Sequence, residues 1–264
     1  MLSETFTQED FNREIKVHEA KIKSFVYRLT ASREDTEDIV QDTFLKAYQK
    51  LDTFRGESSF KTWLFTIAAN TAKNHLKAKR RWPEDAQDQC REICRRENGR
   101  SLTNVNKTAE YGRYEIIEHI DFCFTCIMKT LPLEQHVALM LADIYAFKIK
   151  EIGEIMDMTE GVIKHLLFEA RKIMQAVFEK RCALINKEGI CHQCSELNGF
   201  NNNKADTQRI VAALDIVKAA NDPNKKDLFE IRTKLVRAID PLMAEGTDLH
   251  DYLFKLTSKT LDKQ

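Results

Sequence analysis

Glycine and proline are scarce in this sequence of 264 residues, which contains only 8 Gly and 4 Pro. Because these residues interrupt helices more than any others, their scarcity favours long helices and an all-α fold. Positive and negative charges balance, with 41 Lys and Arg against 41 Asp and Glu. Any binding of nucleic acid must therefore come from local patches of positive charge and not from the net charge.

Long apolar runs are also missing, which argues against a membrane span and a membrane partner. The first ten residues, MLSETFTQED, are polar and acidic, unlike a signal peptide, so we expect a cytoplasmic protein. Its seven cysteines, an odd number, are then expected to be reduced or metal-bound. The patterns G-x-x-x-x-G-K, G-x-S-x-G and H-E-x-x-H do not occur, so nothing supports an enzyme.

Polar stretches divide the periodic segments into blocks. We predict two small helical domains, residues 1–83 and 114–181, joined by a linker, residues 84–113. A cysteine-rich loop, residues 182–203, and a C-terminal helical extension, residues 204–264, follow. Pro83 ends the first block, because proline disfavours a helical conformation in the residue before it.

The segment from Glu37 to Leu51 predicts an amphipathic helix. Its apolar stripe consists of Ile39, Val40, Thr43, Phe44, Ala47, Tyr48 and Leu51. Leu45 falls on the opposite face, among Asp38, Gln41 and Asp42. Such a leucine is either an ordinary exposed apolar residue or the anchor of a docking site for a basic partner.

A second helix is predicted around Phe60 to Leu76, and a basic run follows it. Lys77, Lys79, Arg80 and Arg81 suit either the negative end of a helix dipole or the phosphates of a nucleic acid. The polar loop from Arg55 to Ser59 precedes this helix and could offer small polar groups to an unstacked base. The residues alone leave both interpretations open.

The segment from Leu131 to Met174 predicts a helix-turn-helix. Residues 148–156 form a short helix, Met156 to Met158 the turn, and Thr159 the N-cap of a longer helix. A plain helical hairpin is the alternative. Asp157 stands in the turn, where aspartate tolerates the left-handed conformation.

The stretch from Asp35 to Arg81 resembles the promoter-melting domain of bacterial extracytoplasmic-function (ECF) sigma factors. The resemblance implies that Asp38, Gln41, Asp42 and Leu45 dock onto a coiled coil of core RNA polymerase. It also implies that the loop and the following helix capture a flipped base of the minus-ten promoter element. The residues assigned to this contact are Arg55, Gly56, Ser58, Ser59, Lys61, Trp63, Asn70, Lys73, Lys77, Arg80 and Arg81.

The helix-turn-helix segment resembles the minus-thirty-five-binding domain of the same family, in the same order along the chain. The residues expected to contact this DNA are Thr159, Lys164, His165 and Arg171. Phe168 and Glu169 stand where the family tends to have basic or histidine side chains, so weaker or altered upstream recognition is expected. A sigma factor that binds core polymerase and promoter DNA is the leading interpretation. The alternative is a helix-turn-helix regulator acting without core polymerase, responsive to zinc or to redox state.

Cys182, Cys191 and Cys194 follow a C-x8-C-x2-C spacing, with His192 inside the closing pair. This spacing suits a tetrahedral zinc site, a redox-responsive dithiol or unliganded structural thiols. The residues beyond Met174 exceed a minimal ECF sigma factor and carry further apolar stripes. The extension stabilises the second domain, or packs on the sigma domains and masks their DNA or polymerase contacts until a signal releases it, or binds a separate partner. An anti-sigma factor is a further candidate partner of the protein.

Overall fold

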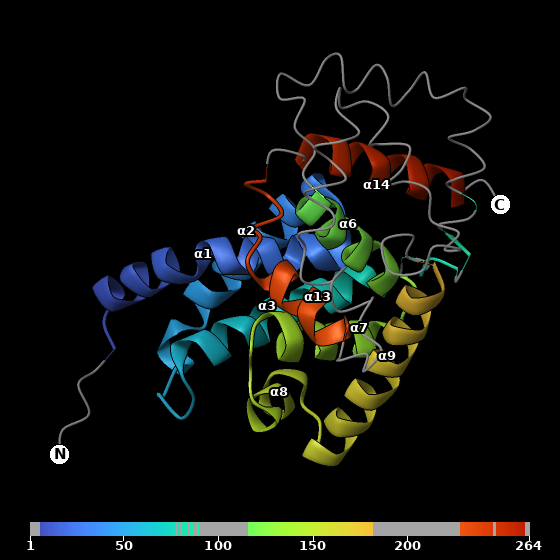
Figure 1. Cartoon of the computed structure of the whole chain (residues 1–264). Helices are drawn as coiled ribbons and strands as arrows, with labels where there is room; N and C mark the ends of the chain where they lie inside the picture. The colour runs from blue at the N-terminus through green and yellow to red at the C-terminus, as the bar shows by residue number, and fades with distance from the viewer. Residues whose placement is uncertain are drawn as a thin grey trace.

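The computed structural model describes residues 6–77, 79, 81–83, 85, 86, 89, 116–181, 228–244 and 247–261. Within these ranges all regular secondary structure is helical, which confirms the predicted all-α fold (Figure 1). None of the helices described there is long and apolar enough to cross a membrane.

The N-terminal unit, residues 6–77, consists of α1 (Gln8–Thr30), α2 (Arg33–Gln49), a 3-10 turn (Leu51–Thr53) and α3 (Phe60–Leu76). Thr7 and Asp10 form a capping box at the start of α1. Ala31, with φ of 55°, ends α1 in the left-handed conformation, so that α2 folds back after a very short turn. Ser32 and Ser59 cap α2 and α3.

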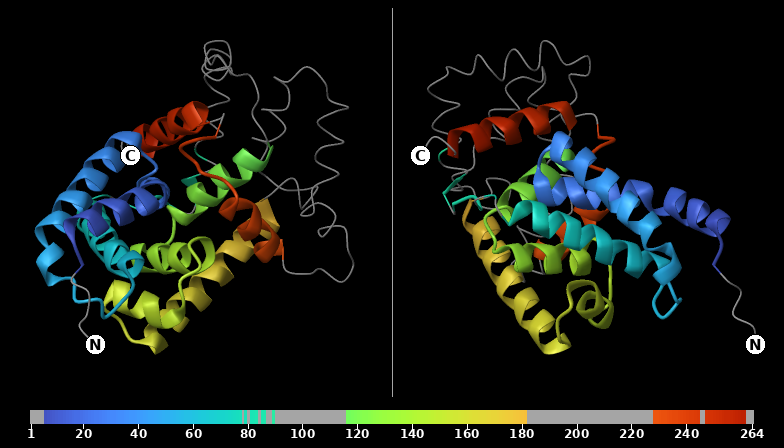
Figure 2. Two further views of the ribbon diagram at one scale, coloured as in Figure 1. Left: turned by 90° about the vertical axis from the view of Figure 1, so that its left-hand side faces the viewer. Right: turned by 180° about the vertical axis from the view of Figure 1, so that it is seen from behind.

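The helix-turn-helix unit, residues 116–181, consists of α6 (Ile116–Met128), α7 (Leu133–Leu139), a π-helical turn (Met140–Ile144), α8 (Ile149–Met156) and α9 (Glu160–Arg181). The C-terminal segment contains α13 (Leu228–Arg237) and α14 (Thr247–Leu261). In both views of Figure 2, α14 runs across one end of the bundle beside α2. Its Asp248 pairs with Arg33 at 2.8 Å, and its Asp251 accepts from the Arg33 backbone N–H at 3.3 Å.

One apolar cluster joins the three parts. It contains Phe25 of α1, Phe65 of α3, Ile152 of α8 and Val236 of α13, all buried. The aromatic rings of Phe65 and Phe147 lie 4.9 Å apart across the junction of the N-terminal and helix-turn-helix units. The two predicted domains therefore share a core, and the C-terminal segment completes it. This arrangement follows from apolar stripes that must each be covered.

Arg28 of α1 is the polar centre of this junction, with 1% of its surface exposed. Its Nε and Nη2 donate to Asp121 of α6 at 3.0 and 2.8 Å. Its Nη1 donates to the Tyr145 hydroxyl at 3.2 Å, and its Nη2 to the carbonyls of Val236 and Ile239 at 3.1 and 2.8 Å. A single guanidinium thus binds groups from all three parts of the chain.

Lys129 is a second buried cation, at the end of α6. Its ammonium donates to the Thr30 carbonyl at 2.8 Å and lies 5.5 Å from the centroid of the Trp82 ring. Burial, reinforced by the nearby charges of Arg81 and Lys79, lowers the pKa of Lys129 to about 7. Folding therefore removes a proton from Lys129 at neutral pH, or holds a charge that is poorly solvated.

We expect Arg28→Met to destabilise the protein by about 3–5 kcal/mol, because it leaves Asp121 and two carbonyls buried without their donor. The measurement is chemical denaturation followed by circular dichroism. Arg13→Met is the matched control, since Arg13 pairs with Asp10 at 2.6 Å but is 66% exposed. Exposed pairs contribute about 0–1 kcal/mol. Equal effects of the two substitutions would contradict the role given to Arg28.

Stability should also rise with pH above neutrality because of Lys129. The unfolded chain binds a proton at this lysine up to its ordinary pKa of about 10.4, whereas the folded chain releases it near 7. Between these values the free energy of unfolding gains up to about 1.4 kcal/mol per pH unit from this group. The melting temperature of the wild type should therefore rise relative to that of Lys129→Met from pH 7 to 9. Parallel curves for the two proteins would refute the shifted pKa.

Candidate interfaces for polymerase and promoter DNA

The outward face of α2 carries the predicted polymerase contact. Asp38, Gln41, Asp42 and Leu45 are all exposed, and 55% of the Leu45 surface is accessible. The opposite face is buried through Ile39, Val40, Thr43 and Ala47. The geometry is thus an apolar side chain surrounded by acidic and amide groups.

Tyr48 was wrongly predicted to be buried with the apolar stripe of this helix. It is 57% exposed, and its ring meets Phe11 edge-on at 6.1 Å. The cause is its position in the last turn of α2, where α1 covers only one side of the ring. Tyr48 lies one turn from Leu45 and extends the exposed apolar area, a feature that the periodicity did not reveal.

Asp35 fixes the orientation of α2 against α3. Its carboxylate accepts from Lys79 at 2.6 and 2.7 Å and contacts His75 Nε2 at 3.1 Å. Burial, the largest single effect, disfavours the charged form, but the hydrogen bonds and charges of Lys79 and His75 together outweigh it and lower the pKa of Asp35. The outward face of α2 is therefore held by a contact on the inner side of the same helix.

The loop predicted to meet the minus-ten element surrounds a small cavity of about 340 Å³. Phe54, Arg55, Ser58 and Trp63 are among its lining residues. The Trp63 ring is packed against Phe54 and Phe60 at 5.2 and 5.3 Å, which gives the cavity a rigid aromatic wall. Gly56 has φ of 70°, a conformation that glycine adopts without strain and other residues rarely take.

Two other residues of the minus-ten set, Ser59 and Lys61, make contacts within the protein. The Ser59 hydroxyl accepts from the Thr62 N–H at 3.0 Å and so caps α3. The Lys61 ammonium donates to the Tyr145 carbonyl at 3.3 Å and lies 3.9 Å from the Phe147 ring centroid. Burial lowers the pKa of Lys61. In this arrangement the helix-turn-helix unit therefore covers the Lys61 ammonium.

Arg81 is likewise engaged internally. Its guanidinium donates to the carbonyls of Leu131 and Met128 at 2.8 Å each, and it lies 2.9 Å from His136 Nδ1. Burial lowers the pKa of Arg81 to about 10. The remaining candidates on α3 are accessible: Asn70 and Lys77 are exposed and Lys73 is half-buried. Arg80 lies outside the described residues.

The helix-turn-helix has the predicted form. Asp157 adopts the left-handed conformation with φ of 55°, and the Thr159 hydroxyl accepts from the Val162 N–H at 3.4 Å. Gly153 was not singled out from the sequence, yet a Cβ there would lie 2.8 Å from the Met158 carbonyl oxygen. Glycine at this position therefore permits the close approach of the chain after the turn.

The candidate DNA contacts on α9 differ in availability. Thr159, Lys164 and His165 are exposed. Arg171 is also exposed, but it donates to both carboxylate oxygens of Asp143, at 2.9 and 2.6 Å, and so ties α9 to the π-helical turn. Phe168 is 63% exposed, which places an apolar ring on the outward side of the recognition helix.

The predicted metal ligands Cys182, Cys191, His192 and Cys194 lie outside the described residues. So do most of the linker and residues 204–227 of the predicted extension. Within the described ranges, no group of three or more His, Cys, Asp or Glu side chains is placed to hold a metal ion. Cys126 is buried and Cys123 half-buried in α6, and buried free cysteines of this kind pack as small apolar side chains.

Two family descriptions match the chain: Sigma-70 region 2 over residues 15–82 and Sigma-70, region 4 over residues 121–174. The ECF RNA polymerase sigma-E factors of Salmonella typhimurium and Escherichia coli K12 are each 34% identical over 165 residues. These matches cover 62% of this chain and 84% of each relative. The ECF RNA polymerase sigma-E factor of Haemophilus influenzae is 32% identical, and the match covers 85% of its length.

Two solved structures align with part of this chain. The sigma factor RpoE of Bartonella quintana, crystallised with the anti-sigma factor NepR, aligns with a TM-score of 0.45 and 24% identity, over 64% of this chain and 96% of that one. CnrH, in complex with the cytosolic domain of CnrY, aligns with a TM-score of 0.46 and 18% identity. That alignment covers 66% of this chain and 90% of CnrH.

The region 2 match covers α2 and α3, which a plain helix-turn-helix regulator does not need, and region 4 follows it in the order that the sequence predicted. The curated relatives contain both parts and are matched over most of their length. The chain belongs to the extracytoplasmic-function RNA polymerase sigma factors.

Proposed function

We propose that this sigma factor binds core RNA polymerase through the outward face of α2. It reads and opens promoter DNA through the minus-ten loop with α3 and through the helix-turn-helix. The observation that carries the polymerase contact is the exposure of Leu45 amid Asp38, Gln41 and Asp42. Burying such a leucine contributes about 1.5–3 kcal/mol, and carboxylates around it favour a basic partner. The chain acts as an adaptor in the cytoplasm and catalyses no reaction itself.

The cavity beside Trp63 is proposed to receive an unstacked base of the minus-ten element. Its aromatic wall offers a surface for stacking, while Arg55 at the loop and Lys73 and Lys77 on α3 can neutralise phosphates. Extruding a base costs a few kcal/mol, which such contacts can offset. Strand separation then needs no chemical step.

The helix-turn-helix is proposed to contact upstream DNA through Thr159, Lys164 and His165. The pairing of Arg171 with Asp143 and the exposed Phe168 support the expectation of weaker or altered recognition, because fewer cations face the phosphates.

The packed arrangement is proposed to be a resting state. The helix-turn-helix unit covers Lys61, and α13 holds that unit through Arg28 and through Arg237, which donates to the Asp143 carbonyl. The α2 face stays exposed, so the regulation would act on DNA contact and not on polymerase contact. A zinc site at Cys182, Cys191, His192 and Cys194 remains a proposal from spacing, and zinc analysis of protein purified without oxygen tests it.

Leu45→Glu and Asp42→Lys should each weaken association with core polymerase about tenfold or more, since one removes the apolar anchor and the other inverts a charge. The measurement is co-migration with core polymerase that lacks a sigma factor, at mild salt. Both sites are exposed, so the helical content should not change. Glu9→Lys makes a similar charge change on exposed α1 and serves as the control. Full association of the two α2 variants would disprove the proposal.

Tyr145→Ala should increase the affinity for a single-stranded minus-ten oligonucleotide. The Tyr145 ring packs on Phe25 and Phe65 at 5.5 and 5.4 Å, so its loss weakens the junction that covers Lys61. The apparent affinity for the oligonucleotide is proportional to the fraction of molecules in which Lys61 is uncovered. When the resting state dominates in the wild type, weakening it raises that fraction, and with it the affinity, by about tenfold or more. Fluorescence anisotropy measures the affinity. An unchanged affinity in a folded variant would count against a resting state, and the gain should vanish when Lys61→Ala is added.

A further inference from the structure

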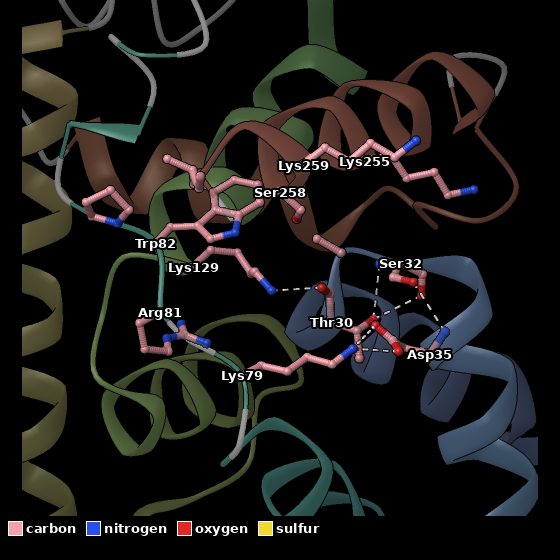
Figure 3. Close-up of a pocket in the computed structure, with 13 residues that line it drawn as sticks. Thr30, Ser32, Asp35, Lys79, Arg81, Trp82, Lys129, Lys255, Ser258 and Lys259 are labelled. Atoms are coloured by element: carbon pink, nitrogen blue, oxygen red, sulfur yellow. Dashed lines mark hydrogen bonds and ion pairs between the residues drawn. The ribbon is translucent and has the colours of Figure 1, made fainter. Parts of the chain in front are cut away.

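A cavity of about 570 Å³ lies where the three parts of the chain meet, away from the α2 face and the minus-ten loop. Its walls come from the α1–α2 turn, residues 79 and 81–83, the end of α6 and one side of α14 (Figure 3). This volume is in the range of small-molecule sites. The cavity is therefore large enough for a ligand and is built from segments far apart in the sequence.

The lining of this cavity is strongly positive. Five cationic side chains and one carboxylate line it, in the following set: Lys79, Arg81, Lys129, Lys255, Lys259 and Asp35. Among the described residues, the ion pairs of these cations are Lys79 with Asp35 at 2.6 Å and Lys255 with Asp251 at 2.7 Å. An excess of positive charge thus remains at the cavity wall.

Lys129 places part of this positive charge in the protein interior. It is 7% exposed, and of its three N–H donors one is given to the Thr30 carbonyl. Buried cations are normally compensated by an anion. The lowered pKa of Lys129 has burial as its main cause, followed by the repulsion of Arg81 and Lys79. An anion in the cavity would reverse this repulsion and restore the charge.

The position of the cations defines the ligand class. Lys129 is buried and Arg81 half-buried, whereas Lys255 and Lys259 stand exposed along α14. Ammonium groups from several directions suit a compact group whose negative charge is spread over many oxygens, as in a phosphate or diphosphate. Ala31, Pro83 and Leu261 add apolar wall that a purely inorganic ion would not need.

We propose that this cavity, called here the junction pocket, binds a small phosphate-bearing molecule that bridges the N-terminal unit, the helix-turn-helix unit and α14. Because every wall belongs to the packed arrangement, a ligand that binds there stabilises this arrangement by its binding free energy. The binding step itself does not rest on the proposed promoter functions, since it involves neither polymerase nor DNA.

The test uses the full chain and inorganic pyrophosphate as probe, with ionic strength matched by sodium chloride. Isothermal titration calorimetry should show saturable binding, and the melting temperature should rise with pyrophosphate concentration. Hydrogen exchange in α14 should slow at the same time. Lys129→Met should weaken binding about ten- to a hundredfold, as expected for loss of a charged hydrogen bond. Lys259→Gln, at an exposed position, should cause a smaller loss without affecting folding.

Lys16→Gln on the exposed face of α1 is the control for a general loss of charge, and it should bind as the wild type does. Lys129→Met removes a buried cation, so its melting temperature in the absence of probe should not fall. The proposal is overturned if pyrophosphate does not bind, or if Lys16→Gln loses as much affinity as Lys129→Met. It is also overturned if only a single-stranded oligonucleotide, and not pyrophosphate, binds in a way that depends on Lys129.

Discussion

The guanidinium of Arg28 is the contact on which the packed arrangement depends. It cannot donate to water instead, because it is almost completely buried, and its N–H groups donate to α6, Tyr145 and the end of α13. Burial works against the charge, but the carboxylate of Asp121 raises the pKa of Arg28 above its ordinary value. The two carbonyls at the end of α13 add the favourable end of a helix dipole. Separating the parts would leave all of these groups in need of new partners.

The Arg28 contacts explain why some candidate binding surfaces of this sigma factor are exposed and others are covered. The α2 face points away from the Arg28 junction and stays exposed, whereas Lys61 points toward it and meets Tyr145 and Phe147. Arg171 and Arg81 are also bound to internal acceptors. Positive side chains of the kind that bind phosphate therefore serve, in this arrangement, as structural cations. The same chemistry suits both uses, since carbonyls and carboxylates compete with phosphate for the same donors.

The described helices of the C-terminal segment, α13 and α14, pack against the two sigma regions. Val236 of α13 belongs to the main apolar cluster, and Phe254 of α14 packs on Phe122 at 4.6 Å in a second one. Asp248 and Asp251 of α14 engage the positive N-terminus of α2 through Arg33. These contacts give the segment both an apolar and an electrostatic reason to dock, and they complete the wall of the junction pocket.

Periodicity and capping residues by themselves determined the helices, the helix-turn-helix and the outward position of Leu45. These features depend on neighbours three or four residues away, as do the left-handed Asp157 and the cap at Thr159. Only the tertiary structure decided which cations are free. The local sequence does not predict the contact of Lys61 with Tyr145 or that of Arg28 with Asp121, because these pairs lie 84 and 93 positions apart in the chain. The exposure of Tyr48 and the need for Gly153 were hidden for the same reason: burial and close approach are properties of the packing between helices, which local pattern does not encode.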